Sequence, residues 1–202
     1  FLPQARRVIA LMPGPQGVLA WPKPSQNVSV LTDERFWPLE TGHVDRLIVL
    51  HGLETSDDAN TVLQEAYRVL GPGGRALFIV PNRAGLWSRS DKTPMGFGRP
   101  YSTSQLETQL RLHGFLPQKA SAALFQIPSN RRSWQKMGPF LERIGNRLPR
   151  LAGGVLMLEV STRTPPLPGL KNPVLRARPL RVLEGLRAAD PKPALERAKE
   201  RC

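Results

Sequence analysis

Short apolar runs, each bounded by glycine, proline or polar residues, recur along the first 160 residues of the chain. Runs of this kind are typical of buried β-strands. The run at residues 46–50 is β-branched and largely apolar at consecutive positions, as expected of a central parallel strand. The predicted strands are residues 7–12, 28–31, 46–50, 75–80, 116–127 and 155–160.

A helical pattern separates the third and fourth of these strands. Ser56 or Asp57 is its expected N-cap, because a short polar side chain can accept hydrogen bonds from the first free amides of a helix. Gly-Pro-Gly-Gly at residues 71–74 predicts the end of the helix, since glycine accepts a left-handed turn and proline cannot continue a helix. The apolar positions that share one face at helical spacing are Leu63, Ala66, Tyr67 and Leu70.

Two further helices are predicted downstream. Ser102 and Gln105 form the pattern of a capping box, which opens a helix that ends at Gly114. Residues 134–148 form a basic amphipathic pattern that Gly138 and Pro139 interrupt. Strands that alternate with helices predict an α/β fold, with a mainly parallel sheet covered by helices on both faces.

In such a sheet, ligands bind at the carboxyl ends of the strands. Candidate functional residues are therefore those that end or follow the predicted strands, near Met12, Leu31, Leu50 and Val80. The pattern stops near Thr162, beyond which repeated prolines prevent regular structure.

The net charge of +13 is unevenly distributed. Residues 163–202 hold ten Lys and Arg against four Asp and Glu, together with many prolines and no aromatic residue. This composition predicts a basic, disordered tail after a domain at residues 1–162. Polybasic segments also attract nucleic acid or acidic membrane surfaces. Arg131, Arg132 and Lys136 form either a patch for phosphate or acidic lipid or a solvated helix face.

The only cysteine is Cys202, which excludes an internal disulfide framework and a cysteine-based metal site. No cluster of His, Asp and Glu has the spacing of metal ligands, so no metal is expected. The chain begins at Phe1 and shows no signal peptide, and a cytoplasmic fragment of a longer protein is the expectation.

Several segments resemble class I S-adenosylmethionine (SAM)-dependent methyltransferases. Residues 45–54 read Asp-Arg-Leu-Ile-Val-Leu-His-Gly-Leu-Glu, and residues 68–75 read Arg-Val-Leu-Gly-Pro-Gly-Gly-Arg. In that family an Asp opens the fourth strand, and a similar turn precedes the fifth. Residues 32–34 resemble the loop after the third strand, and residues 101–115 resemble a late helix ending in Gly-Phe. The likeness covers about residues 5–162 and implies a Rossmann-like fold.

The resemblance implies that the domain binds SAM. In the family, an Asp after the third strand accepts a hydrogen bond from the adenine amino group, and Asp33 matches that position. His51 lies where the fourth strand ends, where it lines the pocket or accepts a proton. The cofactor-binding residues that the resemblance implies are Met12, Thr32, Asp33, Glu34, His51, Gly52 and Leu53.

The sequence departs from the family at two places. The family's first strand and its glycine-rich loop are absent, so we expect a domain that is incomplete at its N-terminus. The family's ribose-binding carboxylate is also absent, because the strand ending Leu11-Met12-Pro13 is followed by no Asp or Glu before Asp33. A chain without the central strand is expected neither to fold alone nor to methylate anything.

The expected function is methyl transfer from SAM to a small molecule. Holding two reactants in line supplies much of that catalysis, so an obvious catalytic side chain is not required. Two alternatives stay open, a non-catalytic methyltransferase-like binding module and a protein that binds or modifies nucleic acid. Residues 83–101 form a long loop rich in Gly, Pro and Arg, which either covers the substrate or lies on the surface.

Overall fold

The computed structural model describes residues 5–14, 17–21, 28–89, 93–126, 128, 132–145 and 153–163. The chain divides into one unit that ends at Pro165 and a second from Pro166 to Cys202. The second unit lies outside the described residues, and so do Lys92 and Arg131 and the side chains of Arg132 and Lys136. The basic tail, its disorder and the basic patch therefore stay predictions.

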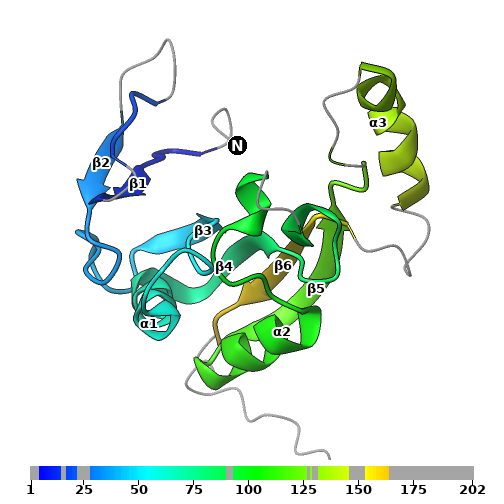
Figure 1. Ribbon diagram of the computed structural model, residues 1–202. Coiled ribbons are helices and arrows are strands. Elements are labelled where there is room, and N and C mark those ends of the chain that lie inside the picture. Colours follow the sequence, from blue (N-terminus) through cyan, green and yellow to red (C-terminus); the bar gives the residue numbers. More distant parts are fainter. Residues whose placement is uncertain are drawn as a thin grey trace, which may run out of the picture. The chain divides into compact units, whose positions relative to one another are not determined.

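Four strands form the larger sheet, in the order β3-β4-β6-β5 (Figure 1). They are β3 (Val44–Leu50), β4 (Leu70–Pro81), β5 (Leu116–Ala123) and β6 (Val155–Ser161). Strands β3 and β4 pair in parallel, whereas β6 runs antiparallel to both β4 and β5. The α/β fold with a mainly parallel sheet is confirmed, and β6 is the reversed strand in this sheet.

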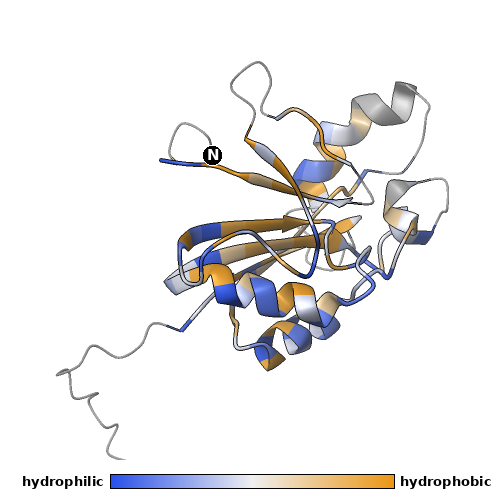
Figure 2. Ribbon diagram, turned by 90° about the vertical axis from the view of Figure 1, so that its left-hand side faces the viewer, coloured by the Kyte–Doolittle hydropathy of each residue, from blue (hydrophilic) through white to orange (hydrophobic). Residues whose placement is uncertain are grey.

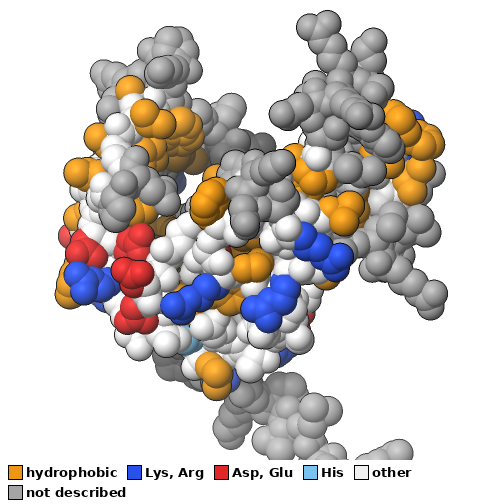
Figure 3. Space-filling view, viewed as in Figure 1, with side chains coloured by type: hydrophobic (Ala, Val, Ile, Leu, Met, Phe, Trp, Pro, Cys, Tyr) orange, Lys and Arg blue, Asp and Glu red, His pale blue; other side chains and the backbone are white. Residues whose placement is uncertain are grey.

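The first two strands form a separate parallel pair. β1 (Ala10–Pro13) pairs with β2 (Ser29–Thr32), with Met12 opposite Leu31 and Pro13 opposite Thr32. This pair shares no ladder with the larger sheet. Its side chains are half-buried or exposed, and Figure 3 shows apolar side chains at the surface in this part of the molecule.

The two helices α1 (Ala59–Val69) and α2 (Thr103–Leu112) lie on the same face of the four-stranded sheet (Figures 1 and 2), whereas the sequence predicted helices on both faces. Between these helices and the sheet lies one apolar core, which includes Leu63, Phe78 and Leu110. Phe78 meets Phe115 edge to face, with ring centroids 5.5 Å apart. The alternation along strands β3, β4 and β6 directs one side-chain set into this core, as the pleat requires.

The start of α1 differs from the prediction. The N-cap is Asp58, not Ser56 or Asp57, and its carboxylate accepts hydrogen bonds from the amides of Asn60 and Thr61. Ser56 instead accepts a bond from the amide of Asp58 and is buried. All three residues are suitable caps, and the sequence could not specify which one has its backbone amides within reach.

The end of α1 also differs. The helix ends at Val69 as expected, but β4 begins immediately at Leu70, so the predicted turn at residues 71–74 belongs to the strand. A Cβ on Gly71 would lie 2.9 Å from the Gly42 carbonyl oxygen. Gly71 is required by the close approach of a neighbouring backbone, and Gly73 adopts the left-handed φ, 72°, that the sequence predicted for this segment.

The later elements largely follow the sequence. Ser102 and Gln105 form the predicted capping box of α2, which ends before Gly114. Helix α3 (Arg132–Gly145) continues through Pro139 without the predicted interruption. Among the residues that the structure describes, none of the helices has the length and apolar character needed to cross a membrane.

Candidate functional site

The parallel strands β1 and β2 end at two of the predicted cofactor residues, Met12 and Thr32. Met12 and Thr32 lie at the same end of the β1–β2 pair, because Met12 is in register with the residue before Thr32. The Met12 sulfur accepts a hydrogen bond from the amide of Leu19 at 3.2 Å. The Thr32 hydroxyl donates to the carbonyl of Phe36 at 3.0 Å and closes the turn that follows β2.

The carboxylate of Asp33 is paired with Arg35. Its Oδ1 accepts from the Arg35 amide at 2.8 Å and from Nε at 3.3 Å, and its Oδ2 accepts from Nη2 at 3.3 Å. These bonds hold the pKa of Asp33 below its ordinary value, the side-chain bond contributing most. A carboxylate offers about four acceptor positions. Oδ2 therefore keeps capacity for one more donor.

Glu34 follows in the same turn. Its backbone carbonyl accepts a hydrogen bond from the Trp37 indole at 3.0 Å. Its carboxylate makes no hydrogen bond or ion pair that the structure records within the described ranges. Glu34 is thus placed near Asp33 by the turn, with its charge free to meet a ligand or water.

The end of β3 brings two side chains together. His51 Nδ1 lies 2.5 Å from Oε1 of Glu54. Glu54 is only 3% exposed, and its Oε2 has no hydrogen-bond partner within the described part of the chain. His51 adopts a positive φ of 53°, while its amide donates to the Ile79 carbonyl at 3.0 Å.

Gly52 and Leu53 continue from His51. Leu53 is 1% exposed and belongs to the core beneath α1, so packing alone requires an apolar residue there. A Cβ on Gly52 would lie 3.1 Å from a Val49 methyl group. The segment after β3 is therefore well packed, and it has a defined position relative to the sheet.

Charged groups link the segment after β2 to α1 and to the residues that precede it. Arg35, in the turn after β2, interacts electrostatically with Asp57 and Asp58, which precede α1. Further along, the Arg68 guanidinium donates to the carbonyls of Trp37 and Leu39 at 3.1 and 2.9 Å. These contacts hold the segment after β2 against α1.

The last part of the long loop packs on Glu54. A Cβ on Gly98, whose φ is 82°, would overlap the Glu54 carbonyl oxygen. The Arg99 amide donates to that same carbonyl at 3.0 Å, and the Tyr101 amide donates to Pro81. The loop also contains two short 3₁₀ helices, η3 (Trp87–Arg89) and η4 (Pro94–Gly96). Its described ends therefore have defined contacts.

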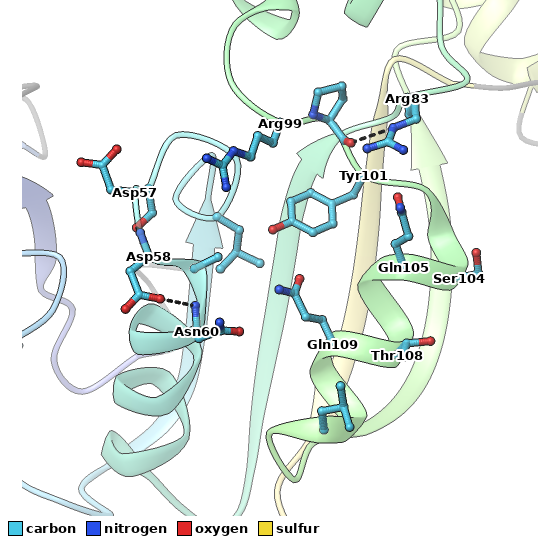
Figure 4. Close-up of a pocket in the computed structure, with 15 residues that line it drawn as sticks. Asp57, Asp58, Asn60, Arg83, Arg99, Tyr101, Ser104, Gln105, Thr108 and Gln109 are labelled. Atoms are coloured by element: carbon cyan, nitrogen blue, oxygen red, sulfur yellow. Dashed lines mark hydrogen bonds between the residues drawn. The ribbon is translucent and has the colours of Figure 1, made fainter.

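An open groove of about 580 Å³ lies between α1 and α2. Figure 4 shows Tyr101 and Gln109 facing Asn60 across it. Its charges are mixed, because Arg83 and Arg99 accompany two aspartates, and Figure 3 shows acidic and basic side chains side by side on this face. Of the predicted cofactor residues, only Leu53 lines the groove. The other predicted cofactor residues lie outside this groove.

Burial raises the pKa of Tyr101 above its ordinary value, and the nearby charge of Glu54 raises it further. The hydroxyl at the groove is therefore protonated at neutral pH. In the described residues no three His, Cys, Asp or Glu side chains are arranged to hold a metal ion.

Residues 5–78 match the family model described as a methyltransferase domain. The structure also resembles solved SAM-dependent methyltransferases. A Thermotoga maritima protein, described as a possible histamine N-methyltransferase, has a TM-score of 0.50 and 19% identity over 67% of this chain. The chain has the class I methyltransferase fold.

Other solved methyltransferases give lower scores. An Archaeoglobus fulgidus protein has a TM-score of 0.47 and 16% identity, covering 69% of this chain and 70% of that one. A Mesorhizobium loti protein has a TM-score of 0.48 and 11% identity, covering 69% and 71%. No curated protein matches the chain. This chain spans 64% of the length of the Thermotoga protein.

Sequence reasoning missed the two side chains that bind the predicted site residues. Glu54 lies three residues after His51, and this spacing was the one sign in the sequence that the two side chains could meet. Arg35 lies two residues after Asp33, within reach of an aspartate in a turn. Neither the burial of Glu54 nor the positive φ of His51 has a local signature in the sequence.

Proposed function

We propose that this domain transfers a methyl group from SAM to a small molecule. Two observations support the proposal: the chain has a methyltransferase fold, and the predicted residues end or directly follow strands β1, β2 and β3. Open α/β sheets bind ligands at this edge. When bound, SAM supplies an electrophilic methyl group.

The chain's donors and acceptors fit the cofactor in part. The free acceptor position on Asp33 Oδ2 suits the adenine amino group, and Glu34 offers a second carboxylate beside it. Met12, Thr32 and Gly52 supply small or apolar surface at the strand ends, whereas Leu53 packs in the core. His51 completes this set, since it directly follows β3.

These residues contribute by orientation. The packed segment after β3 and the hydrogen-bonded turn after β2 would form two sides of the cofactor site. Side chains that are already held in position lower the entropic cost of bringing two reactants together. The groove between α1 and α2 has mixed charge and a volume of about 580 Å³, within the size range of small-molecule sites, although His51 does not line it.

A non-catalytic binding module is the second candidate. One observation favours it: β1 ends with Met12 and Pro13, and the chain has no carboxylate there for the ribose hydroxyls. Met12 is also a weak hydrogen-bond acceptor. Such a module would hold SAM or a related nucleoside without transferring the methyl group.

Two measurements on the full-length protein separate these candidates. Calorimetric titration with SAM and with S-adenosylhomocysteine tests binding, and tritiated-methyl SAM mixed with a small-molecule extract of the source cells tests transfer. The methyltransferase proposal predicts binding of both nucleosides and a labelled product. Binding without labelled product supports the module, and absence of binding refutes both.

Asp33→Asn provides the matched test of the binding site, with Asp45→Asn as its control because Asp45 lies at the other end of β3. Losing a hydrogen bond to a charged acceptor weakens binding by about 1.5–3 kcal/mol, or roughly 10- to 150-fold. An unchanged affinity would remove Asp33 from the site.

A further inference from the structure

The carboxylate of Glu54 is buried with one partner. Its side chain is 2% exposed, and His51 Nδ1 is the group that bonds it. A carboxylate removed from water is costly unless a donor or a positive charge compensates it. The contact with His51 Nδ1 therefore compensates part of the cost of burying the Glu54 carboxylate.

The backbone holds His51 in place on both sides. Its amide donates to Ile79 in the neighbouring strand, and its carbonyl accepts from the Thr55 hydroxyl at 2.8 Å. A positive φ of 53° is uncommon for a residue other than glycine. Strained residues of this kind persist where the surroundings fix them, and they cluster at functional sites.

The contact with Glu54 also sets the hydrogen positions of the ring. If Glu54 is ionised, its carboxylate can only accept, and Nδ1 then carries the hydrogen. In the neutral ring, Nε2 then has a free lone pair. Within the described residues, Nε2 makes no recorded hydrogen bond, and the side chain is 31% exposed. The ring is thus anchored at one nitrogen and open at the other.

We propose that Glu54 positions His51 so that Nε2 accepts the proton of a methyl acceptor carrying an O–H or N–H group. This inference rests on the proposed methyl transfer. Nε2 takes the proton as the acceptor atom bonds to the methyl carbon, while the electron pair of the broken S–C bond stays on sulfur. The Glu54 carboxylate stabilises the resulting imidazolium, which then releases its proton to water.

Neighbouring groups are compatible with this role. Arg99 and Tyr101 come from the loop that covers Glu54, and the charges of Glu54 and Arg99 both act on the Tyr101 hydroxyl. That hydroxyl stays neutral and adds no charge beside the carboxylate. The Arg99 amide is bonded to the Glu54 carbonyl, so the loop holds the backbone of the positioning residue as well.

The direct test is the tautomer of His51 in the full-length protein. Nitrogen-15 NMR of labelled histidine distinguishes the Nδ1–H from the Nε2–H form, and the chain has only three histidines to assign. We expect Nδ1–H in the neutral ring. Glu54→Gln keeps the size of the side chain but can donate to Nδ1, so it should mix the two forms. An Nε2–H tautomer in the unchanged protein would overturn the proposal.

Matched controls separate positioning from folding. Glu65→Gln removes another hydrogen-bonded carboxylate, and His113→Gln removes the histidine bonded to the Gln109 carbonyl. Neither should change the His51 signals. Glu54→Asp retains the charge and should show more of the Nδ1–H form than Glu54→Gln does. If Glu54 had only a structural role, the tautomer of His51 would not depend on the charge at this position.

Transfer of tritium from SAM to the small-molecule extract gives the second readout. General-base catalysis contributes about 10²–10⁴-fold, so His51→Gln should slow the transfer by that factor and His113→Gln should not. An unchanged rate in His51→Gln would refute the proton-acceptor role. If S-adenosylhomocysteine does not bind the unchanged protein, the proposed function fails; if it binds and the tautomer is wrong, only this inference fails.

Discussion

The four-stranded sheet and the β1–β2 pair differ sharply in packing. Phe78 and Val80 of β4 are 0% exposed and lie in a core shared with α1 and α2. In the β1–β2 pair no side chain is fully buried, and Leu31 is 54% exposed. Both regions contain a parallel pair of strands with apolar sequences. Apolar composition alone therefore does not give a strand a core.

This difference bears on function because the candidate site draws residues from both regions. His51, Gly52 and Leu53 follow a strand of the packed sheet, whereas Met12 and Thr32 end strands of the exposed pair. A two-stranded sheet is marginally stable by itself. We expect the β3 side of the site to be rigid and the β1–β2 side to gain order from a bound nucleoside.

The largest expected effect comes from the core. Phe78→Ala should lower the free energy of unfolding by about 3–5 kcal/mol, because it removes a buried ring and leaves a cavity. Leu31→Ala should cost less than about 1 kcal/mol, since more than half of that side chain already meets water. Denaturant unfolding measures both. Equal losses would show that the two regions are packed alike.

The next effect concerns the link between the regions. Arg68→Ala removes the bonds to Trp37 and Leu39 and leaves the half-buried Glu65 carboxylate without its guanidinium partner. We expect a loss of about 1.5–3 kcal/mol, typical of hydrogen bonds to charged groups. Arg75→Ala, which breaks an exposed pair with Glu159, is the control and should cost less than about 1 kcal/mol.

The smallest effect is a pH dependence of the same link. The hydrogen bond from Arg68 lowers the pKa of Glu65, so the folded protein favours the ionised form. The stabilisation that the ionised Glu65 gives the folded protein is complete above the ordinary carboxyl pKa of about 4.3. It is lost as the pH falls through the lower pKa that Glu65 has in the folded protein. The stability difference between the unchanged protein and Glu65→Gln should shrink in that acid range. A difference that stays constant from about pH 7 to about pH 3 would contradict the pairing.

Local patterns in the sequence were enough for most of the fold. Apolar runs predicted the strands, and Ser102 with Gln105 predicted the start of α2, because a capping box involves residues close in sequence. The resemblance to class I methyltransferases added the expectation that these strands belong to a Rossmann-like fold. The direction of β6 could not be read from its apolar run, since parallel and antiparallel partners accept the same residues.

The site was less predictable because its contacts are long-range or conformational. The bond from Arg68 to Trp37 spans 31 residues, and nothing near either residue signals it. The burial of Glu54 depends on Gly98 and Arg99, which lie far downstream in the sequence. Asp33 was predicted from its position after a strand, whereas its ion pair with Arg35 became visible only in the geometry of the turn.

The central claim is that a nucleoside cofactor binds at the strand ends and joins the two regions. Hydrogen exchange of the full-length protein, with and without S-adenosylhomocysteine, tests it most directly. The account predicts slower exchange at Met12, at residues 32–34 and at residues 51–53 together, with the larger change on the exposed β1–β2 side. Binding that protects only the groove around Asn60 and Gln109, or no protection at all, would contradict it.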